Sequence, residues 1–181
     1  GMGLGTLLRR MVIGPGTGGG HDFRSYSLAI KLALVSGLMA AGARVKDIGL
    51  ALSPMAYFAQ FALDTPSVAM VTASHNENGW TGVKMGAARP LTFGPEEMSA
   101  LKTIVLAGDF DLAGGGAYEF VAGFRETYMD DLTVDMRITR KLRVVAACGN
   151  GTAGAFAPEA LARSGCEVIP LDVELDHTFP R

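Results

Sequence analysis

The sequence predicts an α/β fold, a three-layer αβα arrangement with a mostly parallel mixed sheet, followed by the start of a second similar domain. Two observations carry this prediction. Apolar strand-like runs alternate with helix-like patterns, which is typical of strand–helix–strand units with parallel strands. The same alternation restarts near residue 142. We therefore expect a first domain over residues 1–125 and part of a second domain over residues 126–181.

The composition is that of a globular protein, and it excludes two classes of partner. Of the 181 residues 49% are apolar, and a net charge of −2 leaves no basic stripe for a nucleic acid. The most apolar stretch, residues 27–42, carries Lys31 and ends in glycine, so we expect no membrane span. Cys148 and Cys166 form no CxxC pair, and we interpret them as buried, reduced thiols of a cytoplasmic protein.

The first elements are a helix, a glycine-rich stretch and a second helix. Residues 3–13 predict the end of a helix and the start of a strand. PGTGGG at 15–20 is too rich in glycine for either. We expect the next helix over residues 27–41, with Ser25 or Ser27 as its N-cap.

Three strands and a helix follow. RVKDIGL at 44–50 predicts a short strand, and Ser-Pro opens a helix at 53–63 because proline suits the first helical position. SVAMVTAS at 67–74 is an apolar strand of the fully buried kind. VKM at 83–85 predicts another short strand.

The next stretch leads into the second alternation. GPEE at 94–97 opens a helix that Gly108 closes, with its acids in the first turn, where the helix dipole favours them. We expect a loop over residues 111–117 and a helix over 118–136, interrupted near Gly123.

The second alternation comprises a strand at 142–148, a glycine turn at 149–154, a helix ending at Ser164 and a strand at 166–173. Two strands and one helix are too small to stand alone. Either residues 142–181 extend the first sheet, or the chain lacks their continuation.

The turn GNGTAG, residues 149–154, is the first candidate site. It follows a predicted strand and opens a helix, and Asp172 ends the next strand, as in the dinucleotide-binding fingerprint. This pattern would suit an NAD-dependent oxidoreductase. The alternative is a tight turn that needs glycine only for close packing.

The stretch TASHN, residues 72–76, is the second candidate site. Ser74 ends a buried strand, where ligands bind in α/β sheets. A serine becomes a nucleophile when a base takes its proton, and His75 is adjacent. Neighbours on an extended chain point opposite ways, however, so His75 need not be that base. Lys84 could attract a phosphate. The alternative is that these polar residues merely cap a turn.

The segment GHDFR, residues 20–24, is the third candidate. It would place Arg24 near the upper edge of the sheet as a phosphate ligand. The alternative is a surface arginine that pairs with Asp22.

Taken together, these motifs resemble those of the α-D-phosphohexomutase family, in particular its phosphomannomutase/phosphoglucomutase branch. TASHNENGWTGVK at 72–84 resembles the family's phosphoserine loop, and GHDFRSYS at 20–27 resembles its Gly-Arg/His-Asp-x-Arg-x-Ser segment. Residues 144–180 are similar to the start of its second domain, which would make GNGTAG an opening turn that holds no dinucleotide.

The resemblance implies an intramolecular phosphotransferase that interconverts hexose 1-phosphate and hexose 6-phosphate through a bisphosphate. Ser74 would carry the phosphoryl group, with Mg²⁺ on its phosphate as cofactor. His75 would assist proton transfer, Lys84 would stabilise phosphate oxygens, and Arg24 and Asn76 would bind the substrate's phosphate.

Departures from the family pattern shape the remaining expectations. Glu77 replaces the usual proline, Thr81-Gly82 replaces Asn-Gly, and the family's DGDGDR metal loop and later domains are missing. We therefore expect a fragment that is inactive alone, has an incomplete Mg²⁺ site and covers exposed apolar surface as a homo-oligomer. A non-catalytic remnant that only binds a phosphosugar is the remaining alternative.

Overall fold

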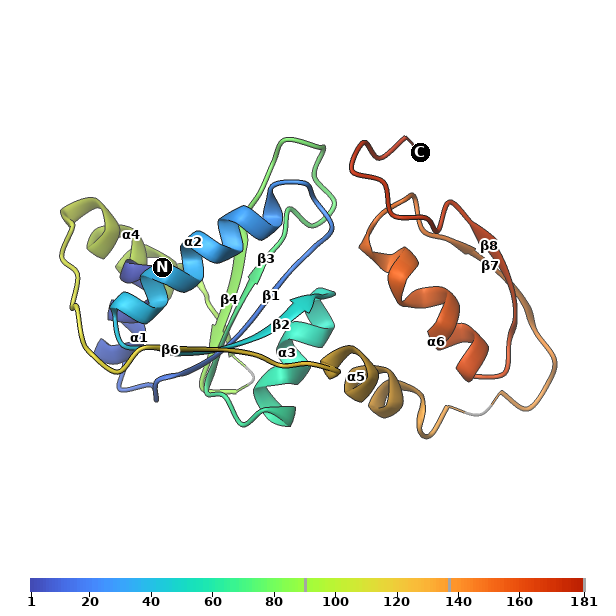
Figure 1. Cartoon of the computed structure of the whole chain (residues 1–181), viewed down its shortest axis with the longest axis horizontal. Coiled ribbons are helices and arrows are strands. Elements are labelled where there is room, and N and C mark those ends of the chain that lie inside the picture. Colours follow the sequence, from blue (N-terminus) through green and yellow to red (C-terminus); the bar gives the residue numbers. More distant parts are fainter. Residues whose placement is uncertain (90, 137, 181) are drawn as a thin grey trace. The chain divides into compact units, whose positions relative to one another are not determined.

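The computed structural model describes residues 1–89, 91–136 and 138–180. The chain divides into two compact units (Figure 1). The first comprises Gly1–Asp22 and Tyr26–Ala122, and the second comprises Phe23–Ser25 and Gly123–Arg181. No helix in the described ranges is long and apolar enough to cross a membrane.

In the described part of the chain, the first unit is built on a six-stranded sheet of order β5-β4-β3-β1-β2-β6. Strands β1, β2, β3 and β6 pair in parallel, whereas β4 is antiparallel to both β3 and β5. This mixed, mostly parallel sheet confirms the predicted fold class. The strands are β1 (Gly16–His21), β2 (Arg44–Leu50), β3 (Ser67–Val71), β4 (Val83–Ala87), β5 (Leu91–Thr92) and β6 (Ala117–Phe120).

Helices cover both faces of this sheet (Figure 1). On one face, apolar side chains of α1, α2 and α4 form a core with those of β2, β3 and β4. On the other face, α3 packs against β1 and β3. The result is the predicted αβα layering. The helices are α1 (Met2–Arg10), α2 (Ser27–Ala40), α3 (Ser53–Ala62) and α4 (Pro95–Ala107).

The segment PGTGGG was predicted to be neither helix nor strand, and this prediction was wrong. It forms most of β1, which lies between β3 and β2 in the sheet. A Cβ added to Gly20 would lie 3.0 Å from the Ala51 Cβ, and one added to Gly18 would lie 3.3 Å from the Thr65 Oγ1. The glycines therefore allow close packing over the strand, a use of glycine that a count of strand formers treats as a break.

The prediction of a helix from residue 118 was also wrong. Ala117–Phe120 forms β6, an exposed edge strand that pairs in parallel with β2. The helix α5 (Phe124–Thr133) begins only after Gly123, whose φ is 75°. The Tyr118 hydroxyl donates to Asp47 Oδ2 at 2.9 Å, a contact with β2 that helix propensity cannot anticipate.

Two groups of charges hold α1 and α2 in the first unit. Lys31, 3% exposed on α2, places its Nζ 2.6 Å from the Oδ2 of Asp47, which is 1% exposed. In contrast, Arg10 at the end of α1 forms exposed ion pairs with Asp109 and Asp111 at 2.9 and 3.0 Å. The Lys31–Asp47 pair is therefore enclosed by protein, whereas the ion pairs of Arg10 face solvent.

The described part of the second unit contains a separate two-stranded parallel sheet of β7 (Arg143–Ala147) and β8 (Glu167–Leu171). Its other elements are α5, the short helix η1 (Thr152–Ala155) and α6 (Ala157–Arg163). Residues 142–180 therefore do not extend the first sheet, which excludes one of the two sequence alternatives. Cys148 and Cys166 are free and only partly buried, next to β7 and β8.

Candidate active site

Ser74 lies where the chain leaves the sheet. Strand β3 is buried along its whole length, Thr72 and Ala73 remain buried, and Ser74 is exposed. Its φ is 56°, in the left-handed region that few non-glycine residues adopt. Residues held in such conformations cluster at functional sites, which makes this serine a candidate nucleophile.

Three backbone hydrogen bonds fix the turn around Ser74. Its own N–H donates to Thr72 Oγ1 at 3.0 Å, and the Asn76 N–H donates to the Ala73 carbonyl at 3.1 Å. The Ala73 N–H donates to Asp22 Oδ2 at 3.2 Å. Both Ser74 and Asn76 therefore lie in an ordered turn that opens to solvent.

His75 lies within reach of the serine hydroxyl. The Ser74 Oγ and the His75 Nδ1 are 3.2 Å apart, and both side chains are exposed. The expectation that these neighbours point apart assumed an extended backbone, and the positive φ of Ser74 removes that assumption. An imidazole nitrogen at this distance can accept the hydroxyl proton when it is not itself protonated.

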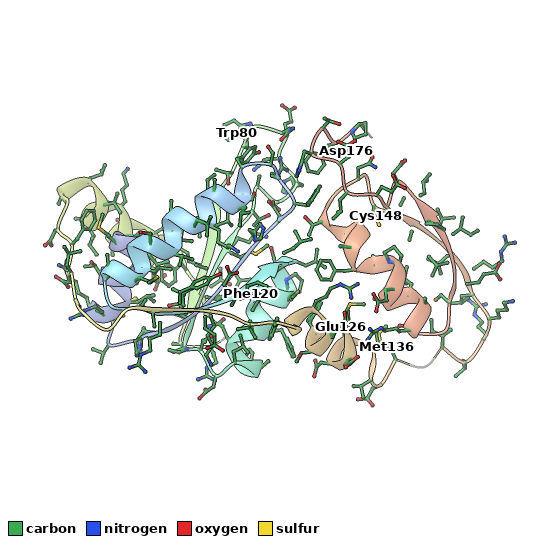
Figure 2. All side chains as sticks on the ribbon, viewed as in Figure 1. Trp80, Phe120, Glu126, Met136, Cys148 and Asp176 are labelled. Atoms are coloured by element: carbon green, nitrogen blue, oxygen red, sulfur yellow. The ribbon has the colours of Figure 1, made fainter. Side chains whose placement is uncertain are left out.

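Tyr26 holds the outer part of the same loop. Its hydroxyl donates to the Trp80 carbonyl at 2.6 Å and accepts the Gly79 N–H at 3.0 Å. Trp80 is 63% exposed at the tip of the loop, and it is labelled in Figure 2. The loop after Ser74 is thus tied to the residue that precedes α2.

Lys84 lies on β4, and its partner is a serine other than Ser74. Its Nζ donates to Ser53 Oγ at 3.1 Å, at the start of α3. In the register of β3 and β4 it lies opposite Met70, within the sheet. Lys84 is therefore ordered and partly buried, with three ammonium protons of which one is engaged by Ser53.

Arg24 is buried, so the interpretation as a surface arginine was wrong. It is 8% exposed and belongs to the second unit, where its guanidinium carbon lies 5.1 Å from the centre of the Phe179 ring. In the same unit, Phe23 stacks on His177 at 4.3 Å and its N–H donates to Thr152 Oγ1 at 2.9 Å.

The glycines of GNGTAG pack against the chain that follows β8. A Cβ on Gly154 would lie 1.9 Å from the Val173 carbonyl oxygen, and one on Gly151 would lie 3.6 Å from the Phe179 ring. The Asn150 N–H donates to the Asp172 carbonyl at 2.7 Å. Close packing therefore accounts for Gly154, and a positive φ of 53° accounts for Gly149, without a bound dinucleotide, whereas a Cβ on Gly151 would make only ordinary contacts.

His21 is the last residue of β1, at the edge of the first sheet from which Ser74 also emerges, and its pKa is shifted. Burial lowers the pKa of its imidazole, and the positive charge of Lys31 lowers it further. Its Nδ1 is buried and forms no hydrogen bond with the residues that the structure describes. We therefore expect a neutral imidazole at neutral pH.

The described residues do not fit a Mg²⁺ site by themselves. No group of three or more His, Cys, Asp or Glu side chains within them is placed to hold a metal ion. Mg²⁺ requires near-octahedral oxygen coordination, of which a phosphate on Ser74 would supply only a part.

Residues 1–112 match the family model of phosphoglucomutase/phosphomannomutase, alpha/beta/alpha domain I. The chain belongs to this family. A phosphomannomutase/phosphoglucomutase of Pseudomonas putida is 37% identical over 161 residues, which are 89% of this chain and 34% of that protein. A probable phosphoglucosamine mutase of Methanocella arvoryzae is 32% identical over 185 residues, covering 99% of this chain and 40% of that protein.

A solved structure of this family has the same fold. The phosphoglucomutase/phosphomannomutase family protein of Burkholderia thailandensis superposes with a TM-score of 0.91 at 30% identity, over 99% of this chain and 40% of that one. The chain therefore spans between a third and two fifths of the length of these relatives.

Three residues that hold the turn at Ser74 and the loop after it were not predicted as site residues from the sequence: Asp22, Tyr26 and Thr72. Asp22 was weighed only as a partner of Arg24. Asp22 directly follows β1, whose carboxyl end lies beside that of β3, but residues 15–20 were not predicted to form a strand, so this position gave no signal.

Proposed function

We propose that this chain is the phosphoryl-transferring part of a phosphohexomutase that interconverts hexose 1-phosphate and hexose 6-phosphate. The observation that carries the proposal is Ser74, exposed in a left-handed turn after β3 with the His75 Nδ1 3.2 Å from its Oγ. Membership of the phosphoglucomutase/phosphomannomutase family supports it.

The proposed cycle moves one phosphoryl group out and another back. A sugar hydroxyl attacks the phosphoserine, so that the P–Oγ bond breaks and a P–O bond to the sugar forms. The proton of that hydroxyl passes to the released Ser74 Oγ. The bisphosphate then reorients, so that its other phosphoryl group faces Ser74. Ser74 Oγ attacks the other phosphoryl group, so that a new P–Oγ bond forms and the bond from phosphorus to the sugar oxygen breaks. His75 accepts the serine proton, which finally reaches the released sugar oxygen. Each transfer depends on positioning and charge neutralisation more than on covalent chemistry.

The remaining roles are proposals drawn from the family resemblance. Lys84 would stabilise phosphate oxygens with the ammonium protons that Ser53 does not engage. Arg24 and Asn76 would bind the phosphate of the substrate. Mg²⁺ would act on the phosphoserine in a longer protein that completes the ligand set.

We further propose that the chain corresponds to the N-terminal part of that longer, cytoplasmic protein, with a domain boundary between residues 125 and 126. Alone it would complete few or no full catalytic cycles, although a single phosphoryl transfer to Ser74 would still occur. The partly exposed apolar side chains of β7 and β8, among them Val145 and Ile169, would be covered in a homo-oligomer.

The test is transfer of a phosphoryl group to Ser74 from glucose 1,6-bisphosphate, followed by mass spectrometry of the intact chain and its peptides. We expect one phosphoryl group on Ser74, none in Ser74→Ala, and an unchanged amount in Ser99→Ala, which removes an exposed serine of α4. Labelling that persists in Ser74→Ala would refute the assignment. Sugar-phosphate binding without any labelling would instead favour the non-catalytic remnant.

A further inference from the structure

The carboxylate of Asp22 joins three elements of the first unit. It is 8% exposed, directly after β1. Its Oδ2 accepts the Ala73 N–H at the end of β3, and its Oδ1 accepts the Ser27 hydroxyl, at 2.5 Å, from the first residue of α2. A buried carboxylate is tolerated only where such donors meet it.

This carboxylate takes the place of a backbone carbonyl in the sheet. The Asp22 N–H donates to the Val71 carbonyl at 3.0 Å, which continues the parallel pairing of β1 with β3. In a regular parallel ladder the carbonyl of the same residue would next accept the Ala73 N–H. Here the side-chain Oδ2 accepts it, so the ladder closes on a side chain and both backbones can leave the sheet.

The residue after this closure is Ser74, in its left-handed conformation. Two further bonds arise inside the TASHN stretch, where Thr72 Oγ1 and the Ala73 carbonyl act as acceptors. The bond from Asp22 connects Ala73 to the end of β1, while the Thr72 N–H donates to the Gly82 carbonyl before β4 at 3.0 Å. Without the bond to Asp22, the peptide unit that carries the Ala73 N–H would be free to rotate. Ser74 could then adopt a negative φ.

We propose that Asp22 is a positioning residue, whose carboxylate holds the Ala73–Ser74 backbone in the geometry that presents the serine hydroxyl for phosphoryl transfer. The consequence for catalysis rests on the proposed function of Ser74, whereas the geometric part does not.

The test uses the full chain labelled with ¹⁵N and ¹³C. In the unaltered protein, a scalar coupling across the hydrogen bond between the Ala73 nitrogen and the Asp22 carboxylate carbon is expected. In Asp22→Ala the Ala73 amide should exchange with solvent roughly tenfold faster, and the Ser74 backbone shifts should move away from their left-handed values. Asp22→Asn keeps an acceptor oxygen and should restore most of both signals.

The matched control is Ser67→Ala, which removes a buried hydroxyl that bonds Thr17 and the Gly16 carbonyl between the same two strands at the other end of the sheet. It should lower stability while leaving the Ala73 and Ser74 signals unchanged. If Asp22→Ala does not fold, the coupling in the unaltered chain and the Asn variant still decide the geometry.

The phosphorylation of Ser74 by glucose 1,6-bisphosphate is then compared among these variants. Slower labelling in Asp22→Ala, recovered in Asp22→Asn, supports the positioning role. Unchanged Ala73 exchange, or equal labelling rates in Asp22→Ala and the unaltered chain, overturns it. Absence of labelling in the unaltered chain counts against the proposed function, and the exchange and coupling data then decide the geometric claim alone.

Discussion

A serine in the left-handed region raises the free energy of the folded chain, so the surrounding turn must offset it. The cost for a residue other than glycine is about 1–2 kcal/mol. Each backbone hydrogen bond of the turn contributes roughly 0.5–1.5 kcal/mol. Three such bonds surround Ser74, one each to Thr72 Oγ1, the Ala73 carbonyl and Asp22 Oδ2. Together they suffice to hold the Ser74 backbone in this conformation before any substrate binds.

Tyr26 should control the mobility of the outer loop. In Tyr26→Phe the Trp80 carbonyl loses a donor and the Gly79 N–H loses an acceptor, so amides of residues 76–81 should exchange several-fold faster. Global stability should fall by only about 1 kcal/mol or less, because these groups can turn to water. Hydrogen exchange and urea unfolding measure the two effects.

The matched control for this change is Tyr57→Phe, which removes an exposed hydroxyl that accepts a bond from Thr92. It should leave exchange at residues 76–81 as it is. An unaltered Gly79 exchange rate in Tyr26→Phe would contradict the role of the hydroxyl.

The residues of this site were predictable to different degrees. Ser74, His75 and Asn76 follow one another in a motif, so reading along the chain finds them. Asp22 meets Ala73 across 51 positions, and Tyr26 meets Gly79 across 53, so only the folded sheet brings them together. The Ser74–His75 contact was left open, because a positive φ for serine is rare and has no sequence signal here.

At the scale of elements, the alternation of apolar strands and helices was sufficient to predict the sheet, and β2 was found with its observed bounds. Three strands were missed: β1, β5 and β6. Strand β5 has only two residues, and β1 and β6 have local sequences that oppose their structure. In β1 the cause is close approach of neighbouring residues over glycines, and in β6 it is pairing with a distant strand. Both causes are contacts between elements, which propensity does not contain.

The close packing over β1 gives a direct test. Gly20→Ala would place a methyl group 3.0 Å from the Ala51 Cβ and 3.2 Å from the Ile48 side chain, so we expect a loss of about 1–3 kcal/mol in the free energy of unfolding. Urea unfolding measures it.

Gly114→Ala is the control for that substitution, because a Cβ there meets nothing within 4 Å. It should be neutral or raise stability by roughly 0.4–1 kcal/mol through the unfolded chain. Equal effects of the two substitutions would show that strand β1 has room for side chains.

At the scale of the whole molecule, stability should depend on pH through His21. Burial, followed by the charge of Lys31, lowers its pKa in the folded chain, so the folded state binds this proton less readily than the unfolded state. Its contribution is complete above the unfolded pKa of about 6.5 and is lost as the pH falls through the folded pKa.

Urea unfolding at about pH 7.5 and about pH 5.5 checks this dependence, with a lower free energy of unfolding expected at the lower pH. The His21→Gln variant should lose a large part of the difference. If the variant and the unaltered chain respond alike, another group causes the pH dependence.

The internal position of the Lys31–Asp47 pair has a consequence for ionic strength. Dissolved salt screens charges that face water far more than charges enclosed by protein. Concentrated salt should therefore weaken the attraction of Arg10 to Asp109 and Asp111, while the attraction between Lys31 and Asp47 should stay nearly unchanged. At high ionic strength, the contact of the C-terminal end of α1 with residues 109–111 should therefore weaken at a lower salt concentration than the contact of α2 with β2.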